Sequence, residues 1–378
     1  MSGLARSKKA LFTLIGLLMA LVLLELLARA ALFASGRGYA QFREYNGWVH
    51  RISIATPPAE HDVSHPFLPY RPRPGYGDIN GIGLRGPEAE WEPAPGVLRV
   101  ACLGGSTTYD NWYPVALEES MNDFFDFHDT PFDSCEVLNF GMASWTSMES
   151  LLNYSLRGVH LKPRIIVIYH GINDAVAGSI PPGATARPDY SHWRTPWIAV
   201  PRPVWDLLPE SLDRFRLVGL ARYGLSKLFL SELDPNQLFR CGLRYSYESG
   251  QGETPFNTFG SNLSAIVSVA LNCSTTVFVV SQVHVSELTE EVFDSGDLAD
   301  RVAAINSEAE EVAHDFESTG RVFFIDAALD LPIRREMMRD NCHFTPEGYA
   351  VLGSFIAGEM LAVLDSLQWD LSEPLDFR

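Results

Sequence analysis

The chain has 378 residues, of which 46% are hydrophobic and 20% are charged, a composition that excludes both wholesale disorder and a polytopic membrane protein. A chain of this length holds one sizeable core with attached segments. Its formal net charge is −18, and because so acidic a protein repels nucleic acid, we expect no nucleic-acid partner.

The first 35 residues contain a segment apolar enough for a membrane. Three basic residues within 6–9 precede an uncharged run over 10–24, which continues past two charges to Ala34. Counted to Ala34, the run reaches the roughly 20 residues of a spanning helix, and the basic residues favour a cytoplasmic N-terminus. We predict a single-pass anchor over 1–35 with the remaining chain outside the cytoplasm. A signal peptide cleaved at the small-x-small triplet 28–30 is the alternative.

Residues 36–95 are rich in Pro, Gly, Arg and aromatic residues and lack a sustained period, which indicates an irregular extension packed on the main domain. From there on, apolar runs typical of strands alternate with segments of helical spacing. The strand runs are 97–103, 137–140, 165–169, 276–283 and 322–325, and the helical segments are 115–125, 148–159, 259–271, 298–316 and 346–367. This alternation predicts an α/β protein, a three-layer α/β/α sandwich around a five-stranded parallel sheet over 96–370.

An insertion over 178–252 interrupts the alternation, with a weak helical pattern near 207–230, and long insertions of this type are often lids or substrate-binding loops. By position, several polar and aromatic residues are further candidates for lining the site, although packing is the more ordinary interpretation for each. They are Tyr109, Asp110, Trp193, Trp197, Trp205, Gln282 and His284.

The five cysteines show no CxxC spacing, so we expect no zinc site, and their odd number leaves at least one unpaired within a monomer. They are Cys102, Cys135, Cys241, Cys273 and Cys342. The apolar run around Cys102 predicts a buried thiol there.

Ligands of an open parallel sheet bind beyond the carboxyl ends of its strands, so the residues after each strand are the functional candidates. Polar and small residues fill four such segments: 104–108, 139–143, 170–174 and 340–345. Acyl transfer needs an activated nucleophile, a base, a group that orients the base, and donors aimed at the developing oxyanion. The four segments supply a candidate for every role.

Ser106, exposed by two preceding glycines, is the candidate nucleophile, with His343 as its base and Asp340, in the same loop, as the orienting carboxylate. Backbone N–H groups of Ser106 and Gly141 and the side-chain amide of Asn173 are the candidate oxyanion donors. Taken singly, each has an ordinary alternative: a capping serine, a solvated histidine, a turn glycine or a loop cap.

In this order and context, Ser106, Gly141, Asn173 and His343 resemble the four namesake residues of the SGNH (GDSL-like) hydrolase superfamily, and the resemblance spans about 97–367. It implies a flavodoxin-like fold and Ser-His-Asp ester hydrolysis, with no metal and no organic cofactor. The first block reads Gly-Gly-Ser-Thr rather than Gly-Asp-Ser-Leu, which is similar to bacterial envelope members that carry an N-terminal membrane segment. Those members also share an Asn-x-x-Gly-x-Arg-Gly stretch, here 80–86, which we expect to pack near the site.

The sequence thus predicts a membrane-anchored serine esterase or O-deacetylase that cleaves acyl esters, on a small molecule or an extracytoplasmic glycan, through an acyl-serine intermediate. Three alternatives stay open: an O-acetyltransferase with the same triad, a lysophospholipase or thioesterase, and a catalytically silent envelope scaffold. The acyl group, its alcohol and the oligomeric state are not predicted.

Overall fold

The computed structural model describes residues 2–34, 62–63, 65, 67–178, 186–190, 215–218, 255–288 and 297–371. The chain divides into two compact units, one comprising 1–59 with 197–241 and the other 60–196 with 242–378. Most of the insertion and all of residues 36–61 lie outside the described residues, as do Trp193, Trp197, Trp205 and Cys241.

The first unit contains the helix α1, Ser2–Ala34. Its stretch Lys8–Ala30 is long and apolar enough to cross a bilayer. Its residues are exposed apart from the half-buried Glu25 and the buried Ala28. Near the end of this stretch, Glu25 accepts hydrogen bonds from the Arg29 side chain and from the backbone N–H groups of Arg216 and Leu217. An N-terminal apolar helix is therefore present, and both an anchor and a signal sequence fit it.

The second unit is built on a parallel five-stranded sheet in the order β4-β3-β5-β6-β7, which confirms the predicted fold class. The strands are β3 (Val97–Gly104), β4 (Ser134–Asn139), β5 (Ile165–Tyr169), β6 (Thr276–Val280) and β7 (Val322–Ile325). Every residue of β5 and β6 is buried, because helices cover both faces. The edge strand β4 begins earlier than predicted, since its Glu136 pairs with the buried Arg99 of β3.

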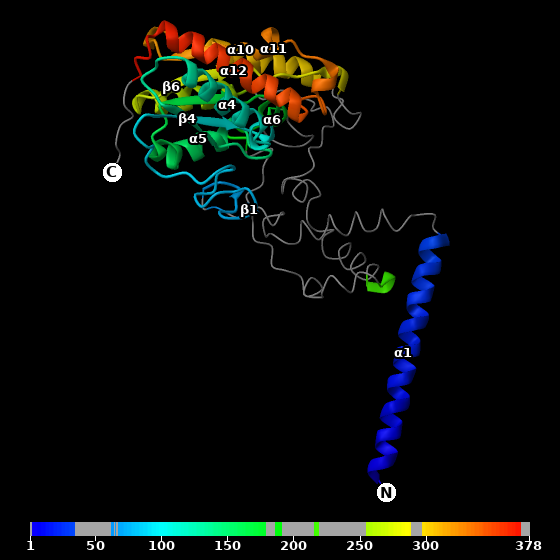
Figure 1. Ribbon diagram of the computed structural model, residues 1–378. Coiled ribbons are helices and arrows are strands. Elements are labelled where there is room, and N and C mark those ends of the chain that lie inside the picture. The colour runs from blue at the N-terminus through cyan, green and yellow to red at the C-terminus, as the bar shows by residue number, and fades with distance from the viewer. Residues whose placement is uncertain are drawn as a thin grey trace. The chain divides into compact units, whose positions relative to one another are not determined.

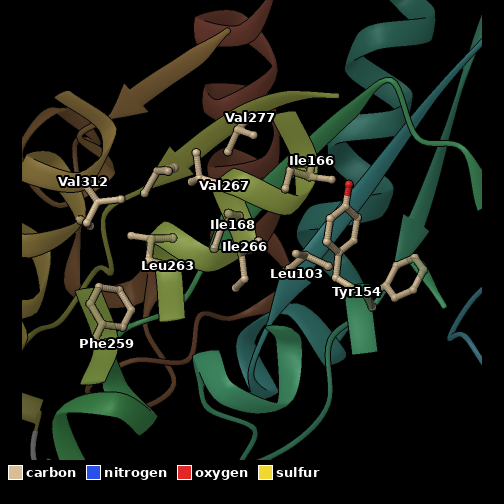
Figure 2. Close-up of a cluster of buried hydrophobic side chains, with 14 of the residues drawn as sticks. Leu103, Tyr154, Ile166, Ile168, Phe259, Leu263, Ile266, Val267, Val277 and Val312 are labelled. Carbon is tan, nitrogen blue, oxygen red and sulfur yellow. The ribbon is translucent and has the colours of Figure 1, made fainter. Parts of the chain in front are cut away.

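Two helical layers enclose the sheet (Figure 1). On one face α4 (Trp112–Phe127) and α12 (Pro346–Ser366) lie side by side over Val100 and Val167. The other face carries α5 (Ser147–Leu156), α9 (Thr258–Asn272) and α10 (Asp297–Asp315). Figure 2 shows this second cluster, in which Ile166 and Ile168 of β5 meet side chains of α9. Alternate strand residues thus fill separate cores, as a three-layer sandwich requires.

Local capping decides where the site-bearing helices begin. In α12, the Thr345 side chain accepts from Gly348 N–H and Pro346 occupies the first turn, so the helix starts directly after the loop that holds His343. A capping box of Thr146 and Glu149 starts α5. Although α12 is apolar enough to pass the length test for a membrane span, nearly half of it is buried, as befits a core helix.

Three short helices directly follow strands, and their extents were not predicted, because four to six residues are too few to show a period. They are α3 (Ser106–Tyr109), α6 (Ile172–Ala177) and α11 (Ala327–Asp330). Single 3₁₀ turns occupy Gly158–Leu161, Ser286–Leu288, Glu317–Thr319 and Arg335–Met337.

The described part of the extension packs on the sheet's unit. A two-residue strand, β2 (Arg71–Pro72), pairs antiparallel with β1 (Asp62–Val63), and Leu68 packs on residues of the site loops. The fully buried Arg99 donates to the carbonyl of Trp91, which holds the end of the extension against β3.

Candidate active site

Ser106 is the first residue of α3, directly after β3. The preceding Gly105 packs so closely on the neighbouring loops that a Cβ atom there would lie 2.6 Å from Asn173 Nδ2. Only glycine fits such an approach. The tight turn at Gly105 therefore brings the serine and the Asn173 amide together.

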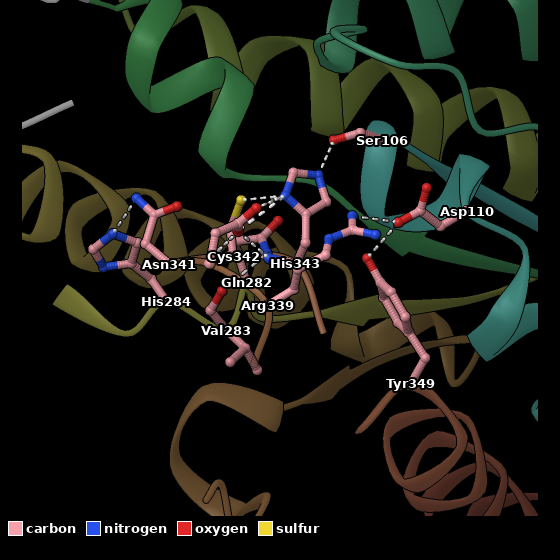
Figure 3. Close-up of polar contacts among 11 residues, drawn as sticks. Ser106, Asp110, Gln282, Val283, His284, Arg339, Asn341, Cys342, His343 and Tyr349 are labelled. Carbon is pink, nitrogen blue, oxygen red and sulfur yellow. Dashed lines mark hydrogen bonds and ion pairs between the residues drawn. The ribbon is translucent and has the colours of Figure 1, made fainter. Parts of the chain in front are cut away.

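Ser106 and His343, 237 positions apart in the chain, meet with 2.7 Å between Ser106 Oγ and His343 Nε2 (Figure 3). On the other side of the ring, His343 Nδ1 lies 2.8 Å and 3.0 Å from the two carboxylate oxygens of Asp340. A carboxylate accepts only, so Nδ1 carries the proton and Nε2 is left to accept from the serine. The three residues predicted from the sequence thus form one continuous chain of hydrogen bonds.

Asp340 is fixed by its own backbone as well as by the ring. Its Oδ1 accepts from the N–H groups of Cys342 at 3.0 Å and His343 at 2.7 Å. Burial on its own raises the pKa of Asp340, but the hydrogen bonds from His343 and Cys342 and the charge of His343 outweigh it and hold the pKa well below its usual value. The carboxylate therefore stays ionised and can stabilise an imidazolium during catalysis.

A thiol lies against the same histidine. Cys342 Sγ is 3.4 Å from His343 Nδ1, and burial raises the pKa of Cys342 well above its usual value. The thiol is therefore protonated and is no rival nucleophile. Asp340, Cys342 and His343 also place one metal-ligating atom each within 4.8 Å of one another. Hydrogen bonds between Asp340 and His343 already use two of these atoms, so the group fits a catalytic pair better than a metal centre.

Two of the three predicted oxyanion donors remain available. Among the described residues, no hydrogen-bond partner is found for the Ser106 backbone N–H, which points from the first turn of α3. Asn173 Nδ2 donates one hydrogen to the carbonyl of Trp145 at 2.8 Å, and its second hydrogen remains.

Gly141 behaves differently from the expectation. Its backbone N–H donates to Asn139 Oδ1 at 2.8 Å, so this donor is already used inside the protein. A Cβ atom on Gly141 would lie 2.5 Å from the backbone nitrogen of Tyr109, which shows that the glycine permits close packing of its loop on α3. Asn139 is itself buried and also donates to the carbonyl of Thr108. An asparagine that accepts from the backbone N–H two residues further on forms an Asx turn, so Asn139 was the sequence signal for this contact.

A second Ser-His-Asp arrangement lies in the interior. Ser150 Oγ is 2.7 Å from His170 Nε2, and His170 Nδ1 is 3.7 Å from Asp174 Oδ2. All three residues are buried, so a substrate cannot reach them. Burial lowers the pKa of His170 to about 3. Burial raises the pKa of Asp174 to about 7, although hydrogen bonds from Ser147 oppose the shift. Ser150 lies in α5, whereas His170 and Asp174 follow β5, so no spacing in the sequence predicts this network.

Asp110, a suspected lining residue, joins the two halves of the site instead. Its backbone N–H donates to the carbonyl of Ser106 at 2.9 Å. Its carboxylate accepts from Arg339 at 2.9 Å and from the Tyr349 hydroxyl at 3.3 Å (Figure 3). The α3 helix is thereby tied to the residue that precedes Asp340.

The 80–86 stretch lies beside the site, as expected. Arg85 pairs through its backbone with Asn139 at the end of β4. Its guanidinium donates to the carbonyl of Tyr109 at 2.8 Å and lies 5.0 Å over the Tyr109 ring. Tyr109 is therefore held by the extension.

The two candidates after β6 are mainly structural. Gln282 is buried, and its amide donates to the Tyr169 hydroxyl at 3.2 Å. His284 Nε2 lies 3.4 Å from the amide of Asn341, so it contacts the loop that carries His343.

No protein-family model matches the chain, and no curated protein matches it. Among solved structures, a GDSL-like lipase from Bacteroides thetaiotaomicron is similar at 14% identity and a TM-score of 0.39, over 71% of this chain and 89% of its own. A putative acylhydrolase from Bacteroides fragilis is similar at 15% identity and a TM-score of 0.37, over 71% and 88%. A variant of an acetyl xylan esterase from Geobacillus stearothermophilus has 10% identity and a TM-score of 0.41, over 69% and 94%. At scores this low the likenesses carry no argument about chemistry, which rests on the geometry of the chain itself.

Proposed function

We propose that the protein is a serine hydrolase of carboxylic esters, with Ser106 as nucleophile, His343 as base and Asp340 as the group that orients the base. The observation that supports this most is the unbroken series of contacts of 2.7 Å and 2.8 Å from Ser106 through His343 to Asp340. A lone serine is a weak nucleophile, whereas a serine in contact with an oriented imidazole is an activated one.

In the proposed reaction, Ser106 Oγ attacks the ester carbonyl while its proton passes to His343 Nε2. Negative charge develops on the carbonyl oxygen, where the Ser106 N–H and the free hydrogen of Asn173 Nδ2 are the proposed donors. The imidazolium then protonates the departing alcohol, leaving an acyl-serine. Water, deprotonated by His343, attacks the acyl carbon, and collapse of the second intermediate returns the proton to Ser106 and releases the acid.

We infer further that the substrate is an acylated glycan outside the cytoplasm, from which the protein removes O-acetyl groups as an O-deacetylase. The apolar stretch Lys8–Ala30, preceded in the sequence by basic residues, supports this location. Rates on acetyl, butyryl and longer p-nitrophenyl esters, measured beside acetate release from acetylated polysaccharides, test the substrate class. Transfer of acetyl to an added glycan acceptor, in place of its release, would contradict the hydrolase and support the acetyltransferase.

The nucleophile is tested by Ser106→Ala. We expect turnover of p-nitrophenyl acetate to fall by about 10³- to 10⁶-fold while the melting temperature stays unchanged. An organophosphonate probe should label the natural protein at Ser106 and leave the variant unlabelled. The matched control is Ser120→Ala, which removes the hydroxyl of a half-buried serine of α4 that lies 2.9 Å from the Ser354 hydroxyl. Equal rates in the two variants would reject Ser106 as the nucleophile.

A further inference from the structure

The buried carboxylate of Asp174 follows Asn173 directly in α6 and is 0% exposed. Both of its oxygens lie 3.1 Å from the backbone nitrogen of Ser147, and the Ser147 hydroxyl donates to Oδ1 at 2.6 Å. The ring of His170 lies 3.7 Å away. A carboxylate with no contact to water needs such donors, so its position is closely determined.

The hydrogen bonds of Asp174 connect segments 145–147 and 173–174, which the Asn173 side-chain amide also connects. Asn173 Nδ2 donates to the carbonyl of Trp145, and Asp174 accepts from Ser147 two residues further on. Asn262 of α9 donates to the Ser147 hydroxyl at 2.9 Å, so a third element also holds this hydroxyl in place. Segments 145–147 and 173–174 are therefore connected twice, so Asp174 determines where the Trp145 carbonyl stands relative to the Asn173 amide.

A third contact comes from the predicted insertion. Tyr190 belongs to the 178–252 segment, is 2% exposed, and hydrogen-bonds through its side chain to Asp174. Its backbone adopts φ of 58°, a conformation that is uncommon for a bulky residue and persists only where the surroundings hold it. The insertion thus reaches the carboxylate beside the amide.

We infer that Asp174 is a positioning residue that orients the Asn173 amide toward the oxyanion, and that Tyr190 couples the insertion to this orientation. The inference rests on the proposed function, in which Asn173 is an oxyanion donor. Asp174 and Tyr190 do not touch the substrate and act through Asn173. The amide must lie within a few tenths of an ångström of its productive place, because small displacements of a donor strongly reduce its effect on the transition state.

The test compares Tyr190→Phe and Asp174→Asn with Tyr154→Phe, which alters a fully buried tyrosine of α5 in the hydrophobic cluster that α5 shares with α9. We expect Tyr190→Phe to lower kcat by about 10-fold and Asp174→Asn by about 100-fold, with KM within about two-fold of the natural protein. Tyr154→Phe should leave kcat unchanged. Tyr190→Phe removes one oxygen atom, so it remains informative where Asp174→Asn fails to fold.

A double-mutant cycle separates positioning from general loosening. Asn173→Ala alone should lower kcat, and in that background Tyr190→Phe should cause no further loss, because it acts only through the amide. A loss of the same size in both backgrounds would overturn the inference, as would an unchanged kcat in Tyr190→Phe or an equal loss in Tyr154→Phe. Labelling of Ser106 by the phosphonate probe in all these variants would show that the proposed function stands even where the inference fails.

Discussion

Two aspartates of the site region experience opposite environments. Hydrogen bonds from His343 keep Asp340 ionised, whereas complete burial makes the charge on Asp174 costly. Only the first of these residues was predicted. Asp340 and His343 follow the last strand and share a loop, so their positions in the sequence already show the pairing. Asp174, Ser147 and Asn262 come from three separate elements, and no spacing connects them before the fold exists.

The pKa shifts of Asp174 and His170 predict how stability depends on pH. The pKa of Asp174 rises on folding from 3.8 to about 7, so its contribution is full below 3.8 and is lost as pH rises to 7. The pKa of His170 falls from 6.5 to about 3, so its contribution is present above 6.5 and is lost as pH falls to 3. Between about pH 4 and 6.5 the two slopes therefore oppose each other.

Asp174→Asn should reveal how the titration of His170 alone changes stability with pH. We expect the variant's free energy of unfolding to rise from pH 5 to 6.5, relative to the natural protein, by up to about 1.4 kcal/mol per pH unit. In His170→Gln, the free energy of unfolding should instead fall with pH relative to the natural protein, up to about pH 6.5. Denaturant titrations at several pH values measure both. Parallel pH profiles for the natural protein and the two variants would contradict these assignments.

At the scale of elements, the sequence predicted the strands and long helices well because each has a sustained apolar pattern. The buried strands Ile165–Tyr169 and Val322–Ile325 were placed to the residue. The extents of the short helices α3 and α6, which carry Ser106 and Asn173, were not predicted. Such one-turn elements are specified by tertiary contacts, here the close approach at Gly105, rather than by local periodicity.

Helices α4 and α12 pack closely against each other, and two glycines of α12 test how much stability depends on that contact. A Cβ atom on Gly353 would lie 2.5 Å from the carbonyl oxygen of Tyr113 and 2.7 Å from Ala116 Cβ, whereas one on Gly358 would meet nothing within 4 Å. Gly353→Ala should destabilise the protein by about 1–3 kcal/mol through overpacking. Gly358→Ala should stabilise it by up to about 1 kcal/mol through helix propensity. Thermal unfolding of both variants measures the difference, and equal effects would show that the helices do not depend on this close contact.

At the scale of the whole molecule, the apolar helix and the sheet belong to separate compact units. The sequence predicted the apolar segment from composition alone, but composition does not distinguish an anchor from a signal sequence. That distinction depends on whether a peptidase cleaves the chain, which the fold does not determine.

Removing residues 8–30 should therefore move the protein from the membrane fraction to the soluble fraction while kcat on p-nitrophenyl acetate stays within about two-fold, because the residues proposed for catalysis all lie in the second unit. Mass spectrometry of the natural protein should find its N-terminal peptide intact. A mature chain that begins beyond residue 30 and fractionates as soluble would establish the signal peptide instead.

The separation of 237 positions between Ser106 and His343 also determines when activity begins. A chain that is synthesised from its N-terminus contains its serine long before its histidine has been added. Without that base the serine is a weak nucleophile. Under the proposed mechanism, an incomplete chain does not hydrolyse esters, and hydrolysis starts only when the last loop and α12 have folded onto the finished sheet.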